Sequence, residues 1–375
     1  MTKPAYRYLY KQILKDLEQK MVFLAGPRQV GKTTLAKSVL EQSQNGVYLN
    51  WDLAAHRKQI LKQELPVAGT VVLDEVHKYR TWRNFIKGFF DVYKNTLKIL
   101  VTGSARLDHY RRGGDSLQGR YHMLHLHPFS VAELGLSKQS ELEDLLQRSG
   151  FPEPYFAKNK IDAKRWSEAY RQRLIQEDVR DLEKIVDLGK LEHLMLYLPD
   201  CVGSNLSVNS LREDLEVSHK ALTHWLLVLE NLCYIYRLSP FASKKLRVLK
   251  KEQKADLYDW SLCEDPAARF ENLVAGHLFK WVHYQQDVLG ERYALQYFRD
   301  VDKREVDFII THNLKPVRAI ECKLTDSNID PSLSYFKKKF PDVDVLQVCL
   351  NPKNEFRNAN GIRVVAALSF LQELV

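Results

Sequence analysis

The sequence has little that would mark a secreted, disulfide-bonded or membrane-spanning protein. Its five cysteines are scattered singly, with no C-x-x-C pair and no histidines at zinc-binding spacing, which argues against a zinc site and for a reducing compartment. The amino terminus lacks the apolar core of a secretory signal, and no run approaches the roughly 18 apolar residues that cross a membrane. No low-complexity tract or internal repeat is present. We therefore expect a cytoplasmic protein without a membrane segment.

The length and charge of the chain set broad limits on its organisation. Its 375 residues exceed the about 250–300 residues over which a single core grows, so we expect two or three domains. The net charge of +9 favours an anionic partner, nucleic acid above all, although such an excess is also compatible with solubility alone.

The most informative stretch is MVFLAGPRQVGKTTL, residues 21–35. An apolar run of strand length breaks at Gly26, and a helical pattern opens at Lys32. The turn fits the phosphate-binding pattern G-x-x-x-x-G-K-[ST], in which backbone N–H groups at a helix N-terminus surround a triphosphate. Lys32 is expected to bridge the β- and γ-phosphates, and the Thr33 hydroxyl to hold Mg²⁺. The residues predicted to bind ATP here are Gly26, Pro27, Arg28, Gln29, Val30, Gly31, Lys32, Thr33 and Thr34.

Further apolar runs at 47–52, 70–76 and 98–104 alternate with helical patterns such as 82–93, and 121–129 offers a fifth strand. This alternation predicts an α/β fold with a parallel sheet covered on both faces. Asp74 and Glu75 end the third run, at the sheet edge where ligands bind in such folds. Asp74 is expected to hold Mg²⁺ through water, and Glu75 to polarise the water that attacks ATP.

Two weaker assignments concern the nucleotide. Thr102 and Ser104 end the next strand, where a hydroxyl can sense the γ-phosphate, although short polar residues also end strands without such a role. Arg120 is the residue we select as an arginine finger acting on a neighbouring subunit; Arg106, Arg111 and Arg112 fit a solvated loop better.

Taken together, GPRQVGKTTL, LDEVHKY, VTGSARL and SLQGRYHMLHLHPFSVAEL resemble the AAA-type ATPases of bacteria and archaea. In that family an ATPase module precedes a carboxy-terminal domain long described as of unknown function. The resemblance extends over essentially the whole chain. It implies an ATPase with a P-loop AAA+ domain, and it names no substrate. We also expect the chain to form a homo-oligomer.

The middle of the chain predicts a charged helical connector at about 151–191, followed by helices at 191–202, 207–215 and 218–231 and two strand-like runs. This order resembles a winged helix. His219, Lys220, Thr223 and His224 are expected to face a DNA groove. The wing lysines and arginine would meet phosphates (Lys244, Lys245, Arg247, Lys250 and Lys251). A purely protein-binding module is the alternative.

The last third contains a second candidate site. Asp307, thirteen residues, then Glu321-x-Lys323 is the core pattern of the restriction-endonuclease-like fold. Its two carboxylates would hold Mg²⁺ or Mn²⁺ and its lysine would activate water. Glu271, on a preceding helix, adds the further acidic residue that such nucleases often keep. A docking domain without cleavage is the alternative.

The sequence thus predicts an AAA-type ATPase domain at 1–150, a helical connector and winged helix at 151–262, and a nuclease-like domain at 263–375. The favoured interpretation is an ATP-dependent DNA-processing enzyme whose nuclease site acts on duplex or branched DNA. The rival is a nucleotide-dependent switch that recruits DNA or protein partners without cutting; a transcription regulator is a third possibility.

Overall fold

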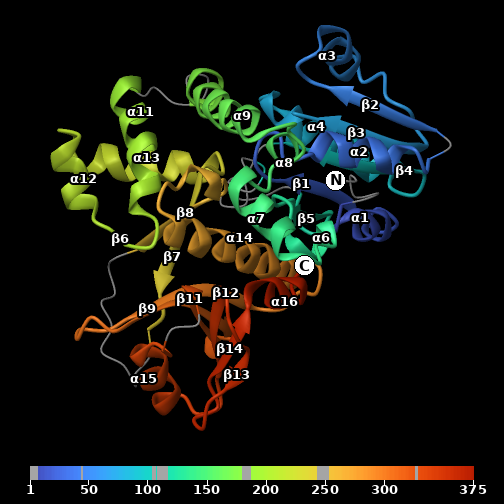
Figure 1. The fold of residues 1–375 in the computed structure, drawn as a ribbon. Helices are drawn as coiled ribbons and strands as arrows, with labels where there is room; N and C mark the ends of the chain where they lie inside the picture. Colours follow the sequence, from blue (N-terminus) through green and yellow to red (C-terminus); the bar gives the residue numbers. More distant parts are fainter. Residues whose placement is uncertain are drawn as a thin grey trace. The chain divides into compact units, whose positions relative to one another are not determined.

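The structure is a computed structural model that describes residues 7–43, 45–103, 107, 117–179, 187–242, 253–325 and 328–375. These residues form two compact units. Unit 1 comprises the residues up to His127 with Asn231–Cys233 and Asp287–Leu289, and unit 2 comprises Pro128–Glu230, Tyr234–Gln286 and Gly290–Val375. Each unit contains its own β-sheet, and the elements are labelled in Figure 1.

Unit 1 is built on a parallel sheet of five strands in the order β2-β3-β4-β1-β5. The strands are β1 (Met21–Ala25), β2 (Gly46–Asn50), β3 (Gly69–Asp74), β4 (Leu97–Thr102) and β5 (Tyr121–His125). The predicted α/β fold with a parallel sheet is therefore confirmed. Because all strands run in one direction, the residues that follow β1, β3 and β4 meet at one edge of the sheet.

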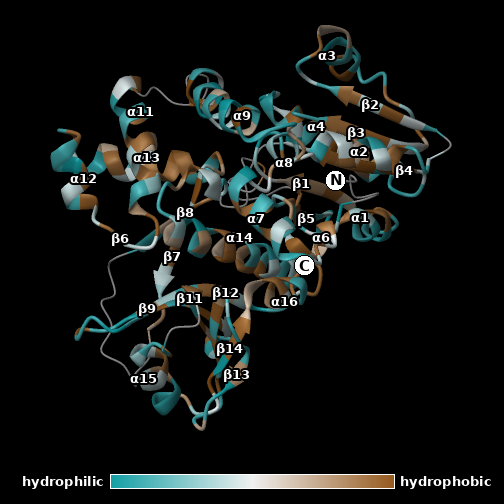
Figure 2. Ribbon diagram, viewed as in Figure 1, coloured by the Kyte–Doolittle hydropathy of each residue, from teal (hydrophilic) through white to brown (hydrophobic). Residues whose placement is uncertain are grey.

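The helices of unit 1 are α1 (Tyr10–Asp16), α2 (Lys32–Leu40), α3 (Ala54–Leu61), the short 3₁₀ helix η1 (Val76–Lys78) and α4 (Trp82–Tyr93). Trp82, Ile86 and Phe90 recur on one face of α4 and pack in the same core as Phe23 and Val71 of the sheet. In Figure 2, strand β3 is mainly brown and α3 is largely teal, as expected for a buried strand and a surface helix.

Unit 2 contains a nine-stranded sheet in the order β13-β14-β12-β11-β10-β9-β7-β8-β6. Its strands are β6 (Asn205–Leu206), β7 (Ile235–Pro240), β8 (Gln253–Leu257), β9 (Tyr293–Arg299), β10 (Glu305–His312), β11 (Lys315–Thr325), β12 (Asp344–Asn351), β13 (Phe356–Arg357) and β14 (Arg363–Ala366). The sheet is mixed: β9, β10 and β11 are antiparallel neighbours, whereas β11, β12 and β14 are parallel.

The helices of unit 2 precede and interrupt this sheet. They are α6 (Val131–Leu134), α7 (Gln139–Arg148), α8 (Pro152–Tyr155), α9 (Lys160–Arg173) with a π-helical end η3 (Leu174–Val179), α11 (Leu188–Tyr197), η4 (Leu198–Cys201), α12 (Val208–Asp214), α13 (His219–Asn231), η5 (Trp260–Leu262), α14 (Pro266–Asp287), α15 (Pro331–Lys339) and α16 (Ala367–Gln372). Of the helices described, none is long and apolar enough to cross a membrane.

The predicted boundary after residue 150 does not coincide with the end of unit 1 at His127. Phe129, Val131 and Leu142 pack in the same hydrophobic core as Phe270 of α14, which places the segment with unit 2. The buried Lys280 side chain fixes this packing: its Nζ donates to Ser130 Oγ at 2.8 Å and to Glu133 Oε2 at 2.6 Å.

The predicted boundary at 262/263 also falls inside unit 2. Helices α11, α12 and α13 lie close to the predicted positions, and β7 and β8 follow them as an antiparallel pair. β7 then pairs with β9 through Ser239 and Gln296, so the strands expected to form a wing continue into the carboxy-terminal sheet. Both edges of β7 are therefore paired, one with β8 and the other with β9. The winged helix itself remains a prediction, and its basic wing residues at 244–251 lie outside the described residues.

Candidate nucleotide site and a carboxylate–lysine cluster

The phosphate loop lies between β1 and α2, as the sequence predicts. Gly26 and Gly31 have φ angles of +149° and +102°, which favour glycine over residues with a side chain. A Cβ at Gly26 would also lie 2.3 Å from the Leu126 carbonyl oxygen, so the backbone has no room for one. Gln29, with φ +58°, is a further left-handed position in the turn. The two glycines therefore give the loop its shape.

Lys32 opens helix α2 and points back into the loop. Its buried Nζ donates to the Gly26 carbonyl oxygen at 2.9 Å and to the Pro27 carbonyl oxygen at 2.6 Å. Burial lowers the pKa of Lys32, while the nearby Glu75 carboxylate raises it. The remaining predicted loop residues, Arg28, Val30, Thr33 and Thr34, lie in this turn and in the first turn of α2. The ammonium is thus held inside the loop where a phosphate group needs positive charge.

Asp74 ends strand β3, and its carboxylate accepts hydrogen bonds from three hydroxyl groups. Its Oδ2 accepts hydrogen bonds from Thr33 Oγ1 at 2.9 Å and from the Tyr48 hydroxyl at 2.5 Å. Its Oδ1 accepts one from Thr102 Oγ1 at 2.5 Å. Burial and the Asp74 carboxylate together raise the pKa of Tyr48 to about 12. The Thr102 hydroxyl is therefore hydrogen-bonded to Asp74. Tyr48 is a further residue of this cluster, and the sequence did not predict it.

The Asp74 cluster contains the oxygen groups that Mg²⁺ prefers. A hydroxyl and a carboxylate 2.9 Å apart, beside a phosphate loop, fit a magnesium ion that accompanies a triphosphate. Thr33 and Asp74 are the residues that would hold it.

Glu75 follows Asp74 in a left-handed conformation with φ +57°. Its N–H donates to the Thr102 carbonyl oxygen at 2.9 Å, which ties the turn to β4. Its Oε2 lies 3.6 Å from Lys78 Nζ and 3.7 Å from His77 Nε2. Burial raises the pKa of Glu75, and Lys32 and Lys78 oppose the rise. A raised pKa suits a carboxylate that accepts a proton.

Arg120 does not join this group. Arg120 lies just before β5, where its carbonyl oxygen accepts from the N–H of Met21 at the start of β1, and its side chain pairs with Asp91 at 2.7 Å. β1 separates this edge from the phosphate loop by about 16 Å of strand, so Arg120 lies away from the loop. Ser104 lies outside the described residues, as do Arg106, Arg111 and Arg112.

The predicted acidic–lysine residues of unit 2 meet on the hairpin of β10 and β11. The register that pairs Phe308 with Ile320 places Asp307 beside Glu321. Asp307 Oδ2 accepts from the Cys322 N–H at 2.8 Å, and Lys323 Nζ donates to Glu321 Oε1 at 2.7 Å. Burial is the main cause of the raised pKa of Asp307. It is also the main cause that raises the pKa of Glu321 to about 8.

Lys254 of β8 joins the predicted residues and was not identified from the sequence. Its Nζ lies 3.2 Å from Glu271 Oε1, 2.6 Å from Glu305 Oε1 and 3.7 Å from Asp307 Oδ1, and the residue is only 2% exposed. Burial alone would lower the pKa of Lys254, but the three carboxylates raise it well above its usual range. Burial also raises the pKa of Glu271 to about 8.

The arrangement around Lys254 does not fit a metal ion. Over the part of the chain that the structure describes, no group of three or more histidine, cysteine, aspartate or glutamate side chains is placed to hold one. The ammonium of Lys254 lies among the carboxylates that a divalent ion would need. The predicted metal ligands Asp307 and Glu321 are therefore adjacent to each other but are not arranged as a metal site.

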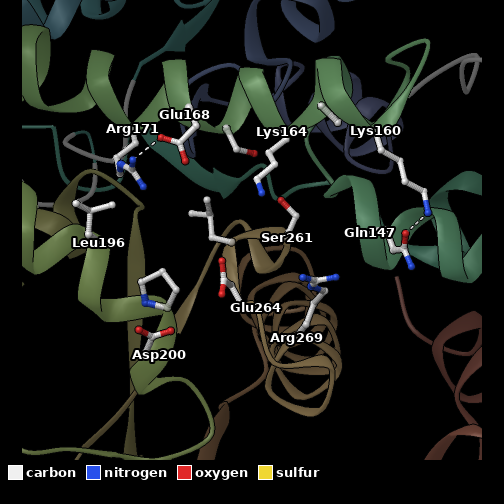
Figure 3. Close-up of a pocket in the computed structure, with 14 residues that line it drawn as sticks. Gln147, Lys160, Lys164, Glu168, Arg171, Leu196, Asp200, Ser261, Glu264 and Arg269 are labelled. Carbon is white, nitrogen blue, oxygen red and sulfur yellow. Dashed lines mark hydrogen bonds and ion pairs between the residues drawn. The ribbon is translucent and has the colours of Figure 1, made fainter.

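Unit 2 also has a pocket of about 640 Å³ between α9, η4 and the start of α14. Figure 3 shows two contacts in its lining: Lys160 donates to Gln147, and Arg171 pairs with Glu168. Asp200, Glu264 and Arg269 complete a lining of mixed charge. Such a lining points to no particular class of ligand.

Comparisons with known proteins divide the chain into three matched segments. Residues 18–135 match the family model described as AAA domain. Residues 139–268 match a domain of unknown function (DUF8612), and residues 267–370 match another (DUF4143). Uncharacterized proteins of Mycobacterium bovis and Mycobacterium tuberculosis are each 22% identical over 325 residues, which cover 84% of this chain and 72% of each relative.

Solved structures similar to this chain include the Aeropyrum pernix ORC1 protein in complex with DNA. It is 13% identical, with a TM-score of 0.35, and the match covers 73% of this chain and 94% of that one. A RuvB variant of Thermotoga maritima is 17% identical with a TM-score of 0.30, over 61% of this chain and 85% of that one. The family match and the loop geometry agree for the first part of the chain. Residues 18–135 are thus similar to an AAA domain, and they contain the phosphate loop between β1 and α2.

Proposed function

We propose that the chain hydrolyses ATP in unit 1 and that hydrolysis drives an action on DNA. The observation that carries the first half is the convergence of Lys32, Thr33, Asp74 and Glu75 at one edge of the parallel sheet. In this proposal the loop binds the triphosphate and Lys32 neutralises charge on the transferred phosphoryl group. Thr33 and Asp74 would hold a magnesium ion, which would supply further neutralisation.

Glu75 is the proposed general base. Its carboxylate takes a proton from a water molecule whose oxygen attacks the γ-phosphorus. The bond to the β-phosphate oxygen breaks, and ADP and inorganic phosphate leave. Partial burial of Glu75 and the raised pKa support this role, because a base whose pKa lies nearer to neutral transfers protons more effectively.

Nucleotide binding is tested by replacing Lys32 with alanine and measuring the affinity for a fluorescent ATP analogue. The expected result is loss of binding with the fold retained by circular dichroism. Lys58→Ala, at an exposed lysine of α3, serves as the matched control and should bind like the wild type. Equal affinity in Lys32→Ala and the wild type would refute the assignment of the loop.

The second half of the proposal, DNA as the partner, is supported by helix α13. His219, Lys220, Thr223 and His224 are exposed on one face, while Leu222 and Trp225 are buried on the other. A polar face that carries a lysine and two histidines suits phosphate and groove contacts. Lys220→Glu should weaken binding to labelled duplex DNA several-fold and lower the salt slope by about one. The exposed Lys158→Glu is the control; equal effects of the two variants would oppose a specific role for α13.

Phosphodiester cleavage in unit 2 is a second candidate function. It is favoured by the hairpin that joins Asp307, Glu321 and Lys323, and it is opposed by the position of Lys254 among the carboxylates. Linear, forked and four-way DNA incubated with Mg²⁺ or Mn²⁺, with and without ATP, tests it. Products that persist unchanged in Asp307→Ala and Lys323→Ala would exclude this site as their source. A wild-type protein that binds DNA, hydrolyses ATP and leaves all substrates intact would instead be a nucleotide-dependent switch.

A further inference from the structure

Lys254 is the most unusual charged residue of unit 2, because it is enclosed by acidic side chains from separate elements. Glu271 comes from α14, and Glu305 and Asp307 come from β10, yet all three lie within 3.7 Å of one ammonium nitrogen. The same nitrogen lies over the Tyr297 ring, 5.6 Å from the ring centroid. Surface lysines have no such enclosure, and a buried ammonium persists only when its charge is compensated.

The cluster contains one more carboxylate that has no counterpart of its own. Asp256 lies two residues after Lys254 on β8, hence on the same face of the strand. It is 2% exposed, and its Oδ2 has no hydrogen-bond partner among the described residues. Arg299 also pairs with Glu305, at 3.0 Å. The cluster still has more carboxylates than cations, and Lys254 is the cation that three of the carboxylates share.

We propose that the Lys254 ammonium is the resident cation of this cluster and occupies the place that a divalent cation would take. A divalent ion and Lys254 then compete for Glu271 and Asp307, and the ion binds only when the lysine side chain has left. While Lys254 is in place, unit 2 keeps the hairpin of a nuclease-like site, but the ammonium prevents a divalent ion from binding there. The inference rests on the geometry of the cluster and holds whether or not the protein cuts DNA.

The test is Mn²⁺ binding to the full-length protein in the absence of nucleotide, in a Lys32→Ala background that removes metal binding through ATP. Manganese electron paramagnetic resonance reports the bound fraction directly. Wild-type Lys254 should leave the cluster with little affinity for Mn²⁺. Lys254→Met should gain affinity on the order of tenfold or more, because one positive charge within about 4 Å is removed. Adding Asp307→Asn to Lys254→Met should abolish the gain, which locates the ion.

Lys280→Met is the matched control, since Lys280 is equally buried but pairs with Glu133; it should not gain Mn²⁺ affinity. The double variant Lys254→Met with Asp256→Asn keeps the net charge of the cluster and leaves the Arg299–Glu305 pair intact, which guards against misfolding. Mn²⁺ should raise the melting temperature of the Lys254→Met protein and leave that of the wild type unchanged.

Three results would overturn the proposal. One is a wild-type protein that binds Mn²⁺ as tightly as Lys254→Met, with loss of binding in Asp307→Asn. Another is a folded Lys254→Met protein, single or double, without the gain. The third is failure of both variants to fold even in Mn²⁺, because an ion in the place of Lys254 should restore the cluster. A DNA-cleavage assay decides the nuclease candidate separately, so the two outcomes remain distinguishable.

Discussion

Thr102 offers a quantitative test of how the nucleotide site is built. The Thr102 side chain is completely buried and donates its hydroxyl hydrogen to Asp74 Oδ1 at 2.5 Å. Valine has a similar shape but no hydroxyl, so Thr102→Val leaves one oxygen of a buried carboxylate without its partner. A hydrogen bond to a charged group contributes about 1.5–3 kcal/mol. We therefore expect unit 1 to lose stability in this range.

The loss is best measured by hydrogen exchange of the peptides that contain β3 and β4, because an overall unfolding curve would mix the two units. A loss of 1.5–3 kcal/mol corresponds to exchange about 10- to 150-fold faster in the most protected amides of these strands. Because Asp74 is predicted to hold the magnesium ion, ATP turnover should also fall, by about 10- to 100-fold.

Thr70→Val is the matched control. Thr70 is a buried threonine at the opposite end of β3 from Asp74, and its substitution should change turnover little. If Thr102→Val exchanges at the wild-type rate in β3 and β4, the hydroxyl does not stabilise Asp74 and the reasoning is wrong. If Thr70→Val and Thr102→Val lower turnover equally, the effect comes from packing and not from the hydrogen bond.

Three further predictions follow from buried or paired charges. Lys280→Met should destabilise unit 2 by about 3–5 kcal/mol, measured by hydrogen exchange of peptides from α14, because it removes the cation that pairs with the buried Glu133 carboxylate. Lys280→Met with Glu133→Gln should recover part of the loss; equal destabilisation of both would contradict this. Burial lowers the pKa of His277 to about 3. Below about pH 6.5 the unfolded chain binds a proton that the folded chain does not, so the free energy of unfolding should fall as the pH drops from about 6.5 towards 3. His277→Gln should show a smaller fall; parallel profiles of stability against pH for the variant and the wild type would contradict this. If Arg120 acts on a neighbouring subunit, Arg120→Ala should lower ATP turnover by about 1,000-fold or more at unchanged nucleotide affinity, whereas unchanged turnover would leave it as the partner of Asp91.

The parts of the site that could be predicted from the sequence are those that depend on short spacings. The phosphate loop is eight consecutive residues at a strand–helix junction, and Asp74 and Glu75 follow an apolar strand directly. The hairpin site is similar, because the alternation of β11 places Glu321 and Lys323 on one face and a short turn returns the chain from β10. Local chemistry decides each of these features.

The residues that were missed depend on long-range pairing. Tyr48 reaches Asp74 because β2 lies beside β3, and nothing near Tyr48 in the sequence signals a carboxylate partner. Lys254 was overlooked because it follows a basic segment and resembles one more surface lysine. Its burial results from the pairing of β7 with β9, which draws the β7–β8 pair into the sheet of β10. The same pairing explains why the predicted boundary at 262/263 lies inside one compact unit.

ATP turnover by Glu75→Gln at saturating ATP tests the central claim most directly. Glutamine keeps the size of the side chain but cannot accept the proton of the attacking water. The account predicts wild-type affinity for ATP and turnover lower by about 10²- to 10⁴-fold, the contribution of a positioned general base. Turnover equal to that of the wild type would contradict the assignment of Glu75 and, with it, the proposed mechanism of hydrolysis.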